Sequence, residues 1–183
     1  MNAESFQLFR VSLVIGSFFI LSSCEKEPKF RVGQDYQGGI IFYVDETGNN
    51  GLIAAREDVG QAAWGCPSIL INGADGEGIG SGFENTLAIV RDCNDPGTAA
   101  ELCENLVLNG FDDWFLPSKE ELNQLYLHRK TVGGFSDELN SAYWSSTEYE
   151  NSFAAWRQLF TDFPEQTIYD KYNVYNVRPI RRF

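Results

Sequence analysis

The sequence is poor in basic residues and in histidine, and it has no apolar run long enough to span a membrane. Its 183 residues include 14 lysines and arginines against 26 aspartates and glutamates, so the formal net charge is −12. Nucleic acids and anionic lipid surfaces attract basic proteins, and this acidic balance argues against both as electrostatic partners. Hydrophobic residues make up 43% of the chain, which is enough for a packed core and excludes a disordered protein.

The scarcity of histidine restricts the catalytic chemistry that the chain can support. His128 is the single histidine, and no Gly-x-Ser-x-Gly motif accompanies it, so neither a hydrolase nucleophile elbow nor an ordinary zinc site is indicated. The glycine-rich stretch 76–82 lacks the spacing of a phosphate-binding loop and carries Glu77, which would repel phosphate. Asn72, Asp75 and Glu77 do not follow the ligand spacing of a calcium loop.

The longest apolar run lies near the N-terminus, between Val11 and Leu21. Eleven residues are about half of what a membrane-spanning helix needs, but they match the apolar core of a signal peptide. The run ends in Leu21-Ser-Ser-Cys24, which resembles the lipobox of bacterial lipoproteins, in which the cysteine is acylated. We therefore expect a lipoprotein signal peptide over residues 1–23, a lipidated Cys24 with a tether over residues 24–32, and a folded domain over residues 33–183.

This organisation predicts a location and a membrane partner. Several acyl chains on Cys24 would hold a soluble domain stably at a bilayer, since each buried CH₂ contributes about 0.8 kcal/mol. The domain would then be extracytoplasmic, at the cell envelope, on the outer membrane or the cell surface.

The order of periodic segments predicts an α+β fold. Residues 39–45 and 51–55 form two β-rich runs, and Asn50-Gly51 between them favours a tight hairpin turn. A long polar loop follows from 64 to 82, with a candidate short strand at 68–71. Helices are expected at 84–92 and 98–108, and a third begins at the capping box Ser118-Lys-Glu-Glu121. Strands are expected at 142–147, 154–160, 167–169 and 174–183, in a mainly antiparallel sheet.

Three cysteines remain beyond the lipobox, so at most one bridge within the chain can form. We favour Cys66 with Cys93, which leaves Cys103 as a buried thiol on the apolar face of a helix. The pair Cys93 with Cys103 is the alternative.

Several motifs in order resemble the Lcl C-terminal domain family, long a domain of unknown function. They are the string from Asn109 to Leu122, the string Tyr143-Trp-Ser-Ser-Thr-Glu148, and the closing Asn176-Val-Arg-Pro-Ile-Arg181. The resemblance implies a compact C-type-lectin-like fold with two to three helices and long loops. By analogy it also implies a homotrimer that binds sulfated glycosaminoglycans. Polysulfate binding needs a basic surface, whereas the evident basic cluster here is limited to Arg178, Arg181 and Arg182.

Candidate site residues lie in the aromatic C-terminal half. Most of these aromatic side chains are expected in the core, and a minority is expected to line a ligand groove, because exposed rings stack on sugars and anchor interfaces. The candidate ligand-binding residues are Trp144, Glu148, Tyr149 and Trp156. If a divalent ion binds, calcium is the candidate cofactor, and the oxygen ligands would come from Asp137, Glu148, Glu150 and Asn151.

Three functions remain in view. The first is a non-catalytic, lipid-anchored domain that binds a glycan or a protein partner at the cell envelope, in adhesion or recognition. The second is a structural envelope protein that assembles and has no free ligand. The third is a hydrolase that would use two facing carboxylates, which would require a pair about 5 to 10 Å apart.

Overall fold

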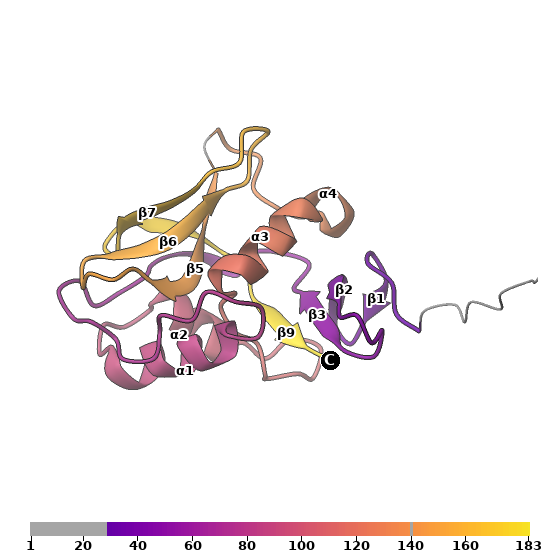
Figure 1. The fold of residues 1–183 in the computed structure, drawn as a ribbon, viewed down its shortest axis with the longest axis horizontal. Helices are drawn as coiled ribbons and strands as arrows, with labels where there is room; N and C mark the ends of the chain where they lie inside the picture. Colours follow the sequence, from indigo (N-terminus) through magenta and orange to yellow (C-terminus); the bar gives the residue numbers. More distant parts are fainter. Residues whose placement is uncertain (1–28, 140) are drawn as a thin grey trace, which may run out of the picture.

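The computed structural model describes residues 29–139 and 141–183, and the expected signal peptide, Cys24 and residues 25–28 of the tether lie outside them. Two sheets and four helices make up the described chain, an α+β architecture (Figure 1). Its helices are α1 (Gly82–Asp92), α2 (Ala99–Glu104), α3 (Lys119–Leu127) and α4 (Arg129–Val132). No helix in this part of the chain is long and apolar enough to cross a bilayer.

The first sheet joins the two ends of the described chain. It has the order β1 (Asp35–Tyr36), β2 (Gly39–Val44), β3 (Gly51–Ala54) and β9 (Ile180–Arg182), and all of its pairings are antiparallel. Phe42, Leu52 and Ile180 pack under α3 with Leu122 and Leu125. This sheet therefore fixes the C-terminal strand beside the N-terminal hairpin, as Figure 1 shows.

The predicted hairpin forms with a longer turn than expected. Positive φ occurs at Gly48, not at Asn50 or Gly51, and the Asp45 carboxylate holds the loop by accepting from the Thr47 hydroxyl and the Asn50 amide. These two bonds lower the pKa of Asp45 to about 2. Gly51 is required for another reason: a Cβ there would lie 2.1 Å from the Tyr43 carbonyl oxygen.

The second sheet has the order β4 (Gly60–Ala63), β8 (Val174–Val177), β5 (Ala142–Glu148), β6 (Ala154–Leu159) and β7 (Gln166–Asp170). One parallel bridge joins β5 to β8, and the other pairings are antiparallel, as predicted. The run 174–183, expected as one strand, is divided at Arg178-Pro179 between β8 and β9, which belong to different sheets. The expected strand at 68–71 is absent, and those residues are irregular loop.

The helix expected over 84–92 begins two residues earlier, at Gly82, and ends at Asp92 as expected. The Ser118 capping box is confirmed, since the Ser118 hydroxyl accepts from the Glu121 amide and the Glu121 carboxylate accepts from the Ser118 amide. The helix expected over 98–108 ends at Glu104, and α4 is an additional helix of one turn after His128. α1 and α2 pack against Trp64 and Trp144 in the core under the second sheet.

A disulfide joins Cys66 to Cys93, the pairing that the sequence favours, and the Cα atoms are 5.6 Å apart. Cys103 is a fully buried free thiol on α2, and burial raises its pKa. The bridge ties the start of the long loop to the residue that ends α1.

Candidate functional site

The long loop over residues 64–81 is fastened to the end of β5 by two consecutive residues, Thr147 and Glu148. The Thr147 hydroxyl donates to the Gly76 carbonyl and accepts from the Lys119 amide at the first turn of α3. The Glu148 amide donates to the Ala74 carbonyl at 2.7 Å. These bonds, together with the burial of Ile71 and Ala74 in the core, hold the loop against β5.

A buried ion pair lies beneath this junction. Glu148 pairs with Lys171, and their side chains are 1% and 0% exposed. Glu148 also accepts from the Ile71 amide at 2.7 Å, while the Lys171 ammonium donates to the Ile69 carbonyl and lies over the Trp64 ring. Burial raises the pKa of Glu148 and lowers that of Lys171, and the hydrogen bond between them opposes both shifts. These contacts make Glu148 a structural anchor of the loop.

The space between the loop and the start of β6 is a cavity of about 550 Å³. One wall is aromatic, because Trp156 and Tyr149 lie edge to face with ring centroids 6.0 Å apart. The other walls are acidic and apolar. The residues that line the cavity are Leu70, Ile71, Asn72, Gly73, Asp75, Glu77, Glu148, Tyr149, Glu150 and Trp156.

One face of the Trp156 ring already carries a cation. The Lys119 ammonium lies 3.6 Å from the ring centroid and 3.0 Å from the Glu77 carboxylate. Lys119 occupies this place because it is the first residue of the capped helix α3, whose start is fixed by Ser118. The cavity wall is thus able to hold a positive group between an indole face and a carboxylate.

The structure separates the predicted ligand-binding residues into two groups. Glu148, Tyr149 and Trp156 line the cavity together. Trp144 does not, because it is fully buried and its indole N–H donates to the Ala62 carbonyl at 3.1 Å. The prediction for Trp144 is corrected: it is a core residue, since its side chain points into the space between the second sheet and the helices α1 and α2.

The predicted calcium ligands are not gathered at one point. The Glu148 carboxylate is bound to Lys171, and the Asn151 side-chain oxygen accepts from the amides of Phe153 and Ala154. Asp137 lines a different hollow, with Arg129 and Asp162. In the described chain, the one cluster with ligand atoms close enough for a metal contains Cys66 and Cys93, which are bonded to each other. The prediction that these four residues together bind calcium is therefore corrected: Asp137 lies in a different hollow, and Glu148 and Asn151 have other partners.

Sequence reasoning missed Asp75, Glu77 and Leu70 as cavity residues. The spacing of Asn72, Asp75 and Glu77 does not match that of a calcium-binding loop, so the sequence gives no reason to place them in a site. They meet Trp156 only because the loop folds back on β5, about 70 residues further along the chain, and no local periodicity signals such a contact.

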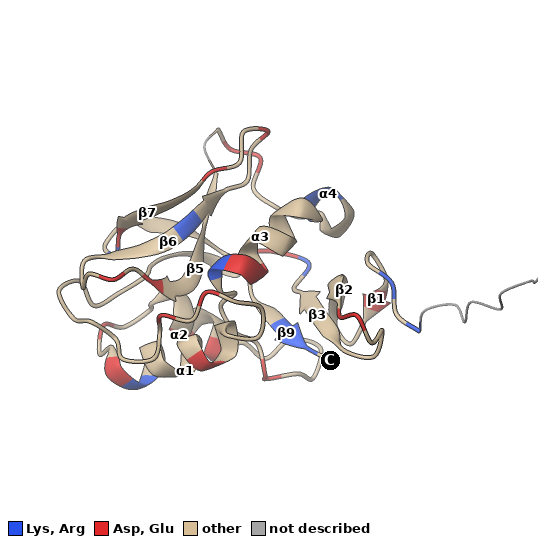
Figure 2. Cartoon of the chain, viewed as in Figure 1, with Lys and Arg blue, Asp and Glu red and all other residues tan. Residues whose placement is uncertain are grey.

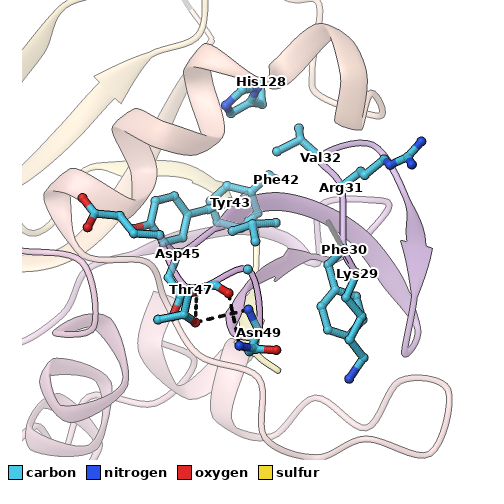
Figure 3. Close-up of a pocket in the computed structure, with 13 residues that line it drawn as sticks. Lys29, Phe30, Arg31, Val32, Phe42, Tyr43, Asp45, Thr47, Asn49 and His128 are labelled. Atoms are coloured by element: carbon cyan, nitrogen blue, oxygen red, sulfur yellow. Dashed lines mark hydrogen bonds between the residues drawn. The ribbon is translucent and has the colours of Figure 1, made fainter. Parts of the chain in front are cut away.

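A larger cavity, of about 860 Å³, lies at the other end of the molecule. Figure 3 shows it between residues 29–32, the hairpin turn and His128 at the end of α3. The dashed bonds in Figure 3 belong to the loop that Asp45 and Thr47 organise. None of the predicted ligand residues lines this cavity.

The Lcl C-terminal domain model matches residues 59–181. The chain belongs to the Lcl C-terminal domain family. The acidic and aromatic cavity lies wholly inside the matched range. In contrast, every residue that lines the cavity of about 860 Å³ precedes that range, except His128. The chain matches no curated protein.

In this Lcl C-terminal domain, two of the three arginines of the basic cluster, Arg178 and Arg181, have a structural role. Arg178 is 1% exposed and binds Asp58 at 2.7 Å, and Arg181 is 5% exposed and binds Asp113 through two bonds of 2.6 and 2.8 Å. Arg182 is the exposed member. Figure 2 shows acidic segments across the rest of the molecule. The cluster therefore supplies little positive surface for a polysulfate ligand.

Proposed function

We propose that the chain is a lipid-anchored, extracytoplasmic domain of C-type-lectin-like fold that recognises a glycan or a protein partner at the cell envelope and catalyses no reaction. The lipobox-like Leu21-Ser-Ser-Cys24 supports the anchor. Membership of the Lcl C-terminal domain family supports the lectin-like fold and, by analogy, a homotrimer.

The observation that carries the binding proposal is the pairing of Trp156 and Tyr149 in one wall of a cavity of about 550 Å³. Aromatic rings at a concave surface stack on the apolar faces of sugars and anchor protein side chains. Exposed carboxylates of Asp75 and Glu150 and the Asn72 side chain line the same cavity, and they accept hydrogen bonds from hydroxyl or amine groups. The ligand chemistry that fits is neutral or amine-bearing, and not sulfated.

The buried carboxylates favour this proposal over hydrolysis. Glu121 and Glu148 are the buried acids of the described chain. Glu121 accepts from the amides of Ser118 and Gly80 as part of a helix cap, and Glu148 is paired with Lys171. Both acids are thus engaged in holding the fold.

An array of neutral, amine-bearing and sulfated glycans, together with envelope proteins, tests the binding proposal. The full chain should bind a neutral or amine-bearing component, and Trp156→Ala should weaken that binding at least tenfold. Chelator should have no effect, because the described residues do not bring the expected calcium ligands together. Tyr172→Ala, an exposed tyrosine outside the cavity, is the matched control. Binding that Trp156→Ala leaves unchanged would refute the role of the cavity.

A structural role in envelope assembly is the second candidate, and two exposed apolar side chains on neighbouring segments favour it. Leu70 is 60% exposed and Phe153 is 57% exposed, and their neighbours Ser68 and Ser152 are joined by a backbone hydrogen bond. Exposed apolar side chains that adjoin one another mark assembly surfaces. Loss of a larger complex on Phe153→Ser, at unchanged ligand binding, would favour assembly.

A further inference from the structure

Arg157 lies on β6 immediately after Trp156, so its side chain points to the opposite face of the second sheet. Its guanidinium lies 3.9 Å from the centroid of the Tyr169 ring and 4.6 Å from that of Tyr175. The two tyrosine rings are 5.8 Å apart and nearly perpendicular. Arg157 is thus held in place by one ring from the neighbouring strand β7 and one from β8, which lies beyond β5 in the sheet.

The guanidinium of Arg157 has no acidic partner among the described residues. Its Nε is buried and has no hydrogen-bond acceptor. The other described arginines are engaged: Arg56 with Asp35, Arg91 with Asp92, Arg129 with Asp162, Arg178 with Asp58, Arg181 with Asp113, Arg182 with the Gly80 carbonyl, and Arg31 with further groups of the chain.

The lack of an acidic partner for Arg157 is unusual because the chain has more acidic than basic residues. The chain has 26 aspartates and glutamates and 14 lysines and arginines, so carboxylates outnumber the basic side chains that they could pair with. Asp170, on the adjacent strand β7, instead accepts from the Tyr172 hydroxyl at 2.9 Å. A partly buried guanidinium that lacks an acceptor costs stability, and an acceptor from outside the chain would remove that cost.

The adjacent strand β7 is an open sheet edge. It pairs with β6 over five consecutive residues without a bulge, and in the described chain no strand pairs with its other side. Its sequence, Gln166-Thr-Ile-Tyr-Asp170, contains no proline or lysine, which are the residues that commonly protect an edge from added strands. Ile168 is 37% exposed on one face and Tyr169 is 43% exposed on the other.

We propose that the outer edge of β7 binds an extended acidic segment of a partner protein by strand addition, with a carboxylate of that segment seated on Arg157 beside Tyr169. An added strand would lie about 4.8 Å from β7. Because the Arg157 guanidinium already reaches over Tyr169, an acidic side chain on the near face of that strand is within its reach. Charge complementarity selects an acidic segment, and alternation places apolar side chains over Ile168.

The experiment measures binding of the full chain to a short acetylated and amidated peptide in which glutamate alternates with valine. Two control peptides replace glutamate by glutamine or carry N-methyl groups on alternate amides. The unmodified peptide should bind, and each control peptide should bind at least tenfold more weakly. Arg157→Gln should cause the same loss, and Arg157→Lys should retain part of the affinity, because lysine keeps the charge and loses the planar fork.

Arg56→Gln is the matched control, since Arg56 is an exposed arginine that pairs with Asp35 of the first sheet, and it should bind as the unaltered chain does. If Arg157→Gln fails to fold, the N-methylated peptide still tests strand addition, because it is measured against the unaltered chain. Equal binding of the glutamate and glutamine peptides, or no binding, overturns the proposal. Arg157-dependent binding of polygalacturonate without peptide binding also overturns it, in favour of an acidic glycan.

Discussion

The Asp45 carboxylate shows how one residue fixes a turn. It accepts from Thr47 and Asn50, and these bonds lower its pKa to about 2. Because the folded pKa lies below the unfolded value of about 3.9, its contribution to stability is present above the unfolded pKa and is lost as the pH falls toward 2.

We predict that a carboxyl-detected NMR titration will give a pKa of about 2 for Asp45, and that amides of residues 46–50 will exchange faster below that pH. In Asn50→Ala the titration should move toward 3.9. A midpoint near 3.9 in the unaltered chain would contradict this account of the turn.

The Glu148 and Lys171 pair makes a second residue-scale prediction. Lys171→Met should lower the free energy of unfolding by about 3 to 5 kcal/mol, because it leaves the Glu148 carboxylate buried without its counter-charge. Adding Glu148→Gln should recover much of that loss. Chemical denaturation of the single and double variants measures both effects, and equal stability of the single variant and the unaltered chain would show that the pair is not an anchor.

At the scale of elements, the junction between α1 and α3 depends on Gly82. A Cβ at Gly82 would lie 2.2 Å from a Glu121 carboxylate oxygen and 2.8 Å from the Leu116 carbonyl oxygen. Although alanine favours helices over glycine, Gly82→Ala should destabilise the chain by about 1 to 3 kcal/mol. Glu84→Ala, on an exposed position of α1, is the control for helix propensity. A more stable Gly82→Ala variant would contradict the packing described for this junction.

The disulfide is the covalent link between the long loop and α1. Cys93→Ser should lower the free energy of unfolding by about 3 to 4 kcal/mol, because Cys66 and Cys93 close a sequence separation of 27 residues. Peptide mapping without reductant should find Cys66 joined to Cys93 and Cys103 unmodified. A bridge between Cys93 and Cys103 would contradict the pairing.

Elements with strong local signals were predictable from the sequence, and those that depend on distant contacts were not. The capping box at Ser118 and the strand at 142–148 are examples of the first kind. β4 was missed because Gly60-Gln-Ala-Ala63 has no β-branched or aromatic residue, and it is a strand only through its pairing with β8. The division of 174–183 follows from Pro179, whose missing amide hydrogen ends β8.

The candidate site was predictable in part for the same reason. Glu148, Tyr149 and Trp156 were recognised from an aromatic and acidic cluster in the sequence, and they line one cavity. Composition alone did not separate Trp144, which is core, from Trp156, which faces the cavity. That difference depends on which face of β5 and β6 each residue occupies. The sequence does not show which face the helices α1 and α2 cover, so it does not show which tryptophan is buried.

On the scale of the whole molecule, the proposed anchor and the two proposed binding surfaces have different positions. Trp156 and Arg157 lie on opposite faces of the second sheet, and residues 29–32, the described end of the expected tether, lead into β1 of the first sheet. The protein could therefore engage a ligand and an acidic partner while it is held at a membrane. We predict that metabolic labelling with a fatty-acid analogue will mark the unaltered chain and not Cys24→Ser, and labelling of both would contradict the anchor site.

The most direct test of recognition through the Trp156 cavity is the affinity of the full chain for its best array component, measured by calorimetry with the unaltered chain and with Trp156→Ala. We predict at least a tenfold loss of affinity in Trp156→Ala, an unchanged affinity in Tyr172→Ala, and no effect of chelator. Equal affinity of Trp156→Ala and the unaltered chain would contradict the account.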